Sequence, residues 1–128
     1  MSTIPEELSY TEEHEWISAV DEQTVVRIGV TDFAQQELGD VVFVQLPEVG
    51  TAISQGEAVG EIESTKSVSE VFAPLDGEIV ARNEALEDDP ALVNSDPYGE
   101  GWLFDLRLDD PQAVDQLLDA TGYQQQVG

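Results

Sequence analysis

Residues 58–73 read AVGEIESTKSVSEVFA, and this stretch predicts the fold because it has the form of a β-hairpin with a lysine at its tip. Residues 58–63 and 69–73 have strand-like patterns, and Lys66 is at the centre of the polar segment between them. Lys66 is the only lysine of a chain that has 28 acidic residues. A single primary amine at a hairpin tip suggests an attachment point for a prosthetic group.

Two other uses of Lys66 are weaker interpretations. Most exposed lysines only contribute charge to the surface. A catalytic lysine needs an apolar pocket or neighbouring cations to favour its neutral form, whereas the nearby acids Glu61, Glu63 and Glu70 favour the ammonium ion. Lys66 is therefore a poor catalytic amine, although an enzyme that brings its own activated acyl donor can still acylate it.

The composition predicts one folded, acidic domain. The chain has 128 residues, 41% of them hydrophobic, which is enough for a core but leaves little room for a second domain. Its net charge of −24 should repel nucleic acids and anionic membranes, which bind proteins through Lys and Arg. Because the acids are spread along the chain, we interpret them as a solvated surface adapted to a salt-rich cytoplasm, as in a halophilic organism.

The cellular compartment follows from what the sequence lacks. There is no cysteine, so neither disulfides nor thiolate metal sites are available. Residues 1–7 have no basic region and no apolar stretch, which is inconsistent with a secretory signal, and their acidity does not suit a transit peptide. No apolar run approaches the length of a membrane span. We expect a soluble cytoplasmic protein.

The rest of the chain predicts short strands and two helices. Residues 24–30 alternate as a strand, and residues 33–38 form a short helix that Thr31 or Asp32 can cap and that Gly39 ends. Further strands are expected at residues 41–46, 69–73, 77–81 and 102–108, the first of them buried. Residues 47–50, 54–57 and 74–77 are turns.

The chain should end in a helix at about residues 111–121. Asp110 provides the cap, Pro111 suits the first turn, and Gly122 is expected to stop the helix. Many short strands with Gly and Pro turns, together with a terminal helix, indicate a mainly β protein, either a small sandwich or a flattened barrel.

His14, the sole histidine, and the two tryptophans offer no other site. His14 lacks the second histidine of a zinc-protease motif, so we expect neither metal binding nor acid–base catalysis from it. Trp16 and Trp102 should pack in the core.

Seven segments, in order along most of the chain, together resemble the H-protein family of the glycine cleavage system. One such segment would be weak, but a collinear set makes chance similarity remote. The segments are YTEEHEW (10–16), GVTDFA (29–34), LGDVVFV (38–44), LPEVG (46–50), ESTKS (63–67), APLDGE (73–78) and NSDPYGEGW (94–102).

This resemblance implies a single lipoyl-carrier domain over residues 1–128, with a lipoyl-type hairpin core at about 24–108. In that family the lysine that matches Lys66 carries lipoic acid through an amide. Glu63 and Gly77 match the positions that the lipoylating enzymes recognise. Glu15 and Glu70 stand where the family's pattern would put acids beside the loaded, cationic arm, although in so acidic a chain each could also be a surface charge.

The resemblance also implies a set of partners and no catalysis by the carrier itself. A pyridoxal-phosphate glycine decarboxylase would load the arm with the aminomethyl group of glycine. A tetrahydrofolate-dependent aminomethyltransferase would unload it, and a dihydrolipoyl dehydrogenase would reoxidise the dithiol. A lipoate ligase, or a lipoyl or octanoyl transferase, would attach the cofactor. We expect the carrier to be a monomer.

Three alternatives stay open from the residues. Lys66 could carry biotin, although biotin carriers usually have methionines beside the lysine, where this chain has Thr65 and Ser67. The chain could be a lipoyl carrier or lipoate-relay protein of another pathway. It could also be an unmodified acidic binding protein in which Lys66 is incidental.

Overall fold

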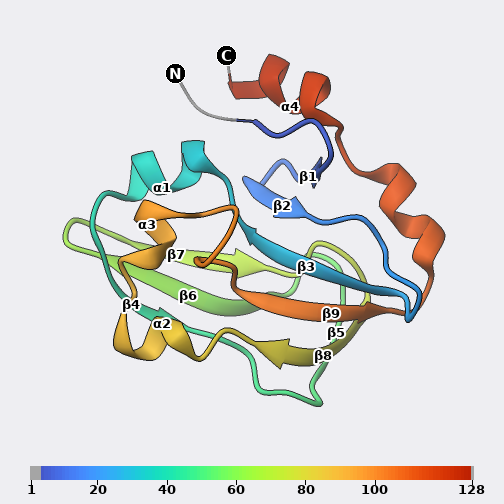
Figure 1. The fold of residues 1–128 in the computed structure, drawn as a ribbon, viewed down its shortest axis with the longest axis horizontal. Coiled ribbons are helices and arrows are strands. Elements are labelled where there is room, and N and C mark those ends of the chain that lie inside the picture. The colour runs from blue at the N-terminus through green and yellow to red at the C-terminus, as the bar shows by residue number, and fades with distance from the viewer. Residues whose placement is uncertain (1–3, 128) are drawn as a thin grey trace.

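The computed structural model describes residues 4–127. Residues 1–3 and 128, which belong to the predicted domain 1–128, lie outside the described residues. The described chain forms two antiparallel sheets with helices at one end and above them (Figure 1). The sheets do not close into a barrel, so the predicted mainly β, flattened sandwich is confirmed.

The larger sheet has six strands in the order β1-β2-β3-β9-β8-β5, and the smaller has three in the order β4-β6-β7. The strands are β1 (Ser9–Tyr10), β2 (Glu15–Ile17), β3 (Val25–Val30), β4 (Val41–Gln45), β5 (Ala52–Ile53), β6 (Ala58–Ser64), β7 (Val68–Phe72), β8 (Gly77–Arg82) and β9 (Phe104–Leu108). The helices are α1 (Asp32–Leu38), α2 (Ala85–Asp88), α3 (Leu92–Ser95), the 3₁₀ helix η1 (Pro111–Gln116) and α4 (Ala120–Val127).

The core lies between the two sheets and is built by alternation along the strands. In β3, Val26 and Ile28 are fully buried while Arg27 between them is exposed. Ile79 of β8 and Ile62 of β6 belong to the same core cluster. The period-two pattern thus identifies the inward faces of these strands.

Helix α1 forms almost as predicted. It begins at Asp32, one residue earlier than expected, because Thr31 is the cap and its side chain accepts a hydrogen bond from Ala34 N at 3.2 Å. Gly39 ends the helix with a φ of 79°, a conformation that glycine adopts without the steric cost of a Cβ.

The prediction that residues 41–46 form a buried strand is wrong in its burial. β4 is an edge strand that pairs only with β6, and its register shifts between Val41 and Phe43. Val41 and Val44 are buried, whereas Val42 and Phe43 are 47% and 54% exposed. An apolar run on an edge strand with a bulge therefore has one buried side only.

The predicted C-terminal helix at 111–121 is also wrong. Asp110 caps η1 by accepting from Gln112 N, as expected, but the helix stops at Gln116. The backbone of Leu118 instead exchanges hydrogen bonds of 2.8 and 2.9 Å with Tyr10 of β1. A separate helix α4 then begins, and Gly122 lies inside it.

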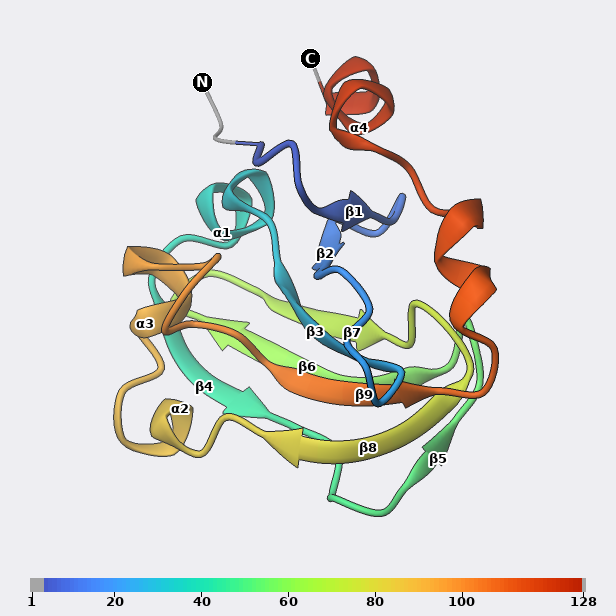
Figure 2. The ribbon, with the colours of Figure 1, turned by 45° about the vertical axis from the view of Figure 1, so that its right-hand side comes forward.

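A second, smaller core joins the two ends of the chain. Tyr10, Trp16 and Tyr123 are buried together, with the rings of Tyr10 and Tyr123 stacked at 4.8 Å. Figure 2 shows α4 above β1 and β2. The burial of Trp16 is confirmed, although it lies in this cluster and not between the sheets.

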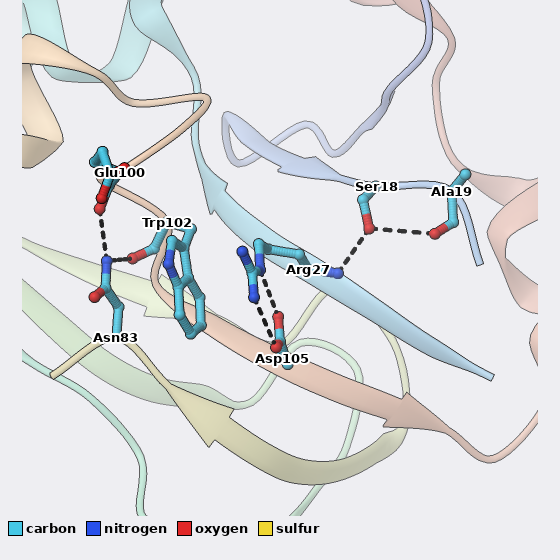
Figure 3. Close-up of polar contacts among 7 residues, drawn as sticks. All are labelled: Ser18, Ala19, Arg27, Asn83, Glu100, Trp102 and Asp105. Carbon is cyan, nitrogen blue, oxygen red and sulfur yellow. Dashed lines mark hydrogen bonds and ion pairs between the residues drawn. The ribbon is translucent and has the colours of Figure 1, made fainter. Parts of the chain in front are cut away.

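Trp102 is only half-buried and has a polar neighbour that the sequence did not indicate. The Arg27 guanidinium lies 3.9 Å from the centre of the indole ring and also pairs with Asp105, as Figure 3 shows. The Asn83 side chain donates to the carbonyl oxygens of Glu100 and Trp102 at 2.7 and 2.8 Å. These contacts hold the loop that leads into β9.

Residues 4–127 contain neither a membrane-spanning helix nor a metal-binding cluster. No helix within residues 4–127 combines the length and the apolar character needed to cross a membrane. Within the same residues, no cluster of three or more His, Asp or Glu side chains could hold a metal ion.

Candidate functional site

Lys66 lies at the tip of the β6–β7 hairpin, at one end of the smaller sheet. Ser64 N donates to Ser67 O at 2.8 Å and closes a tight turn whose outer residues, Thr65 and Lys66, are exposed. The hairpin itself is as predicted, with both strands within one residue of the expected bounds. Figure 1 shows this tip projecting beside α1.

The Ser64 hydroxyl fixes the main chain of the turn. The backbone N–H groups of Lys66 and Ser67 donate to Ser64 Oγ at 3.3 and 3.1 Å, and the hydroxyl lies 3.1 Å from Ser67 O. Ser64 is buried although its neighbours are exposed. Short hydroxyl side chains are well suited to such local bonds to the backbone.

The α1–β4 connection supports the turn from outside the hairpin. Thr65 N donates to Asp40 O at 3.0 Å. Gly39 lies against the lysine, since a Cβ at this position would be 3.3 Å from Lys66 Cε. Sequence reasoning assigned Gly39 to the end of a helix and missed this second use. No pattern within the hairpin itself indicated the contact.

Lys66 differs from the three arginines in having no ion pair with any residue of the described part, 4–127. Arg27 pairs with Asp105, Arg82 with Glu87, and Arg107 with Glu78. Among residues 4–127, no carboxylate oxygen lies within 4.0 Å of the Lys66 amine. Although the chain has 28 acids, Lys66 at the hairpin tip is the one Lys or Arg side chain without an ion pair within residues 4–127.

A cavity of about 360 Å³ lies beside the hairpin, between β7, β2 and α1. Glu15 and Glu70 both line it, so the structure brings together the two acids that the sequence singled out. Apolar side chains make up much of the remaining wall. The lining residues are Glu13, His14, Glu15, Val30, Phe33, Ala34, Glu37, Leu38, Ile62, Ser67, Val68, Ser69, Glu70 and Val71.

Glu15 is a buried acid, only 3% exposed. Burial raises the pKa of its carboxyl to about 8, and hydrogen bonds from Phe72 N at 2.9 Å and Thr11 Oγ1 at 3.2 Å oppose that rise. The carboxyl therefore reaches from β2 to the free edge of β7. Glu70, by contrast, is exposed on β7.

His14, a half-buried residue of the cavity wall, begins a series of hydrogen bonds that leads away from the cavity. His14 Nδ1 is 2.8 Å from the Tyr123 hydroxyl, which is 2.7 Å from Thr31 Oγ1. Burial lowers the pKa of the His14 imidazole. These hydrogen bonds link α4 to the start of α1. Sequence patterns gave no sign of the contact between His14 and Tyr123, which are 109 positions apart.

The two positions singled out for recognition by lipoylating enzymes lie far apart. Glu63 is exposed on β6 close to the tip. Gly77 begins β8 at the opposite end from the tip and is buried (Figure 1). A Cβ on Gly77 would be 2.3 Å from Arg107 O, so the close approach of β8 to β9 requires glycine there.

Two packed antiparallel sheets with a lysine on an exposed hairpin tip define a small carrier domain of the lipoyl or biotinyl type. Comparison with known proteins identifies the family. The model of the family described as "Glycine cleavage H-protein" matches residues 8–128. The chain therefore belongs to the glycine cleavage H-protein family.

Individual relatives agree along almost the whole chain. The glycine cleavage system H protein of Kocuria rhizophila is 57% identical over 125 residues, 98% of each chain. That of Mycolicibacterium gilvum is 57% identical over 130 residues, covering 99% of this chain and 98% of the relative. The crystal structure of an H protein from Mycobacterium marinum superimposes with a TM-score of 0.89 at 48% identity, covering 98% of this chain and 99% of that one.

Proposed function

We propose that Lys66 carries a lipoyl group through an amide bond and that the protein is the non-catalytic shuttle of the glycine cleavage system. The observation that carries this proposal is an exposed lysine that has no ion pair within residues 4–127 and stands on a turn held by Ser64 and Asp40. The lipoyl group would supply a reactive dithiolane at the end of a flexible arm. The protein would supply the position of that arm.

The lining of the cavity beside the tip suits such an arm. The half-buried Phe33 and Ala34 offer apolar surface to its hydrocarbon part. Glu15 and Glu70 offer carboxyl groups to a cationic amine at its end. A cation beside the Glu15 carboxyl would favour its ionised form and so lower a pKa that burial has raised. We propose that these two acids hold the loaded arm out of water.

The partners that we propose are the three enzymes of the system. Glycine decarboxylase would deliver the aminomethyl group, the aminomethyltransferase would accept it, and dihydrolipoyl dehydrogenase would restore the disulfide form. Covalent attachment keeps the arm at high effective concentration near whichever enzyme is docked. We further propose that the protein acts as a monomer in the cytoplasm, and that a lipoate ligase or a lipoyl or octanoyl transferase recognises it through Glu63 and Gly77.

The proposal is tested by intact mass spectrometry, with fragmentation across Lys66, after incubation with a lipoate ligase, lipoate and ATP. We expect a mass gain of one lipoyl group on Lys66 and none on Lys66→Arg, which keeps the charge but offers no acylable amine at neutral pH. A biotin-sized gain on protein from its native host would assign it to the biotinyl carriers. A wild-type chain left unmodified in both preparations would contradict the carrier function.

A further inference from the structure

The outward side of the smaller sheet forms an exposed surface next to Lys66. Phe43, Glu63 and Val68 face one another across the three strands. Directly paired residues share a face with Cβ atoms roughly 5 Å apart. The next row on the same face is Gln45, Glu61 and Glu70. We call these six exposed residues the outer face; two of them, Val68 and Glu70, also line the edge of the cavity.

The outer face carries two of the four exposed large hydrophobic side chains of the described residues. Among residues 4–127, the exposed large hydrophobic side chains are Val42, Phe43, Val49 and Val68. Phe43 and Val68 are on the outer face, 54% and 59% exposed, and Val42 precedes Phe43 on the same edge strand. In a chain with a net charge of −24, apolar side chains gathered beside one lysine are unusual and mark a contact surface.

The position of this surface favours one kind of occupant. An enzyme that acylates the bare Lys66 amine must bring that amine to its own bound acyl donor, so its contacts must surround the hairpin tip. Enzymes that act on a loaded arm can dock farther away, because the arm spans the gap. The row Phe43–Glu63–Val68 is the first row of the sheet below the turn.

The charges of the outer face further restrict the kind of partner that can bind it. Glu61, Glu63 and Glu70 lie among the apolar side chains, so a complementary surface must combine an apolar patch with Arg or Lys side chains. A second copy of this chain does not meet that requirement, because each copy carries −24 and its three arginines are already paired.

We propose that Phe43 and Val68, with Glu61 and Glu63 on the strand between them, form the docking surface for the acyltransferase that modifies Lys66. This inference rests on the proposed function of Lys66 and adds the residues by which the enzyme recognises the unmodified protein. The complementary surface of the enzyme has cationic side chains at its centre, opposite Glu61 and Glu63, and apolar side chains on either side, opposite Phe43 and Val68.

The test measures KM and kcat for acceptor acylation by a lipoate ligase with lipoate and ATP, followed by intact mass. Val68→Ser has a matched control in Val49→Ser, since Val49 is 58% exposed but lies on the β4–β5 turn away from the tip (Figure 1). We expect Val68→Ser to raise KM about fivefold and Phe43→Ser about tenfold, with kcat unchanged. Val49→Ser should leave both parameters at their wild-type values.

The charged part of the surface has its own matched pair. Glu61→Gln should raise KM and weaken its dependence on KCl, because one carboxylate of the docking surface is lost. Glu48→Gln removes an acid that is also exposed but lies on the β4–β5 turn, and it should change neither KM nor its dependence on KCl. Thermal melts of all variants in the assay buffer verify that they are folded.

Each other outcome overturns the proposal in a distinguishable way. Wild-type KM and kcat for both Phe43→Ser and Val68→Ser would show that the ligase docks elsewhere. Normal acylation combined with a raised KM in glycine–CO₂ exchange would assign the surface to the decarboxylase. A wild-type dimer in light scattering that Phe43→Ser abolishes would assign it to a second copy. A wild-type chain that is not acylated at all would contradict the proposed function itself.

Discussion

Glu15 stands apart from the other acids of the chain because the fold buries it. Its carboxyl accepts hydrogen bonds from Phe72 N and Thr11 and has a pKa raised to about 8 by burial. The folded protein therefore binds a proton that the unfolded chain, with the ordinary value of 4.5, has already released. The contribution of Glu15 to the free energy of unfolding is therefore greatest at acid pH, and it is lost as the pH rises toward 8.

Replacement of Glu15 by Gln should remove this pH dependence. The amide keeps an oxygen for Phe72 N and cannot ionise. Between about pH 5 and pH 8 the wild type should lose up to about 1.4 kcal/mol of unfolding free energy per pH unit relative to Glu15→Gln. Urea unfolding at constant high KCl measures it.

The control is Glu12→Gln, which removes an exposed acid from the neighbouring loop. Its effect on stability should change little across the same pH range. A constant difference between Glu15→Gln and the wild type at every pH would mean that the Glu15 carboxyl titrates normally.

At the scale of the element, α4 depends on a cap that the sequence analysis assigned to no role. Asp119 accepts a hydrogen bond from Gly122 N at 2.7 Å, three residues into α4. The helix carries Tyr123, which is buried against Tyr10 and bonded to His14 and Thr31. The cap therefore stabilises a helix that covers the small core behind the cavity.

Asp119→Ala should lower the free energy of unfolding by about 1 kcal/mol, the usual cost of a lost N-cap. Asp119→Asn, which can make the same bond, should be close to the wild type. Asp115→Ala serves as the charge control, because Asp115 is an exposed acid of η1. Equal effects of the two alanine variants in urea unfolding would mean that net charge, and not capping, is responsible.

The elements that the sequence predicted are those with strong local signals. The hairpin around Lys66, α1 with its Thr31 cap, and the alternating strand β3 all follow from patterns within a few residues. The strand β2 was missed because its three residues are all buried and show no alternation. The helix at 111–121 failed because Leu118 pairs with Tyr10, a contact that no local pattern encodes.

In the candidate site, too, the sequence indicated single residues but not the contacts between distant segments. Lys66 could be singled out because it is the only lysine, and the family pattern pointed to Glu15 and Glu70. The contact of Gly39 with the lysine and the hydrogen bond between Tyr123 and His14 join segments distant in sequence. Only the fold reveals such pairs.

At the scale of the whole molecule, charge repulsion is the dominant feature that packing does not explain. Against 28 acids there are four cations, and the three ion pairs within residues 4–127 are largely exposed and contribute little each. Most of the acids therefore repel one another across the surface. Such repulsion weakens as salt shortens the Debye length from about 10 Å at 0.1 M to about 3 Å at 1 M.

We expect the Tm to rise by at least about 5 °C between roughly 0.1 M and 1 M KCl, since a gain of 1 kcal/mol corresponds to several degrees in a domain of this size. Thermal melts followed by circular dichroism provide the measurement. NaCl at the same ionic strength should give the same rise, because screening does not depend on which monovalent cation is present. A flat Tm in both salts would contradict the interpretation of the acids as an adaptation to salt.

The hydrogen bonds of Ser64 also determine where movement can occur. They hold the main chain of the turn, so whatever is attached to Lys66 swings from a stationary pivot, through side-chain torsions alone. Val68 and Glu70 of β7 belong both to the wall of the cavity and to the outer face, so the two sites adjoin along this edge strand. Under the proposals made above, an enzyme that covers these two residues also covers part of the cavity wall. Docking of that enzyme and storage of a loaded arm in the cavity would therefore exclude one another.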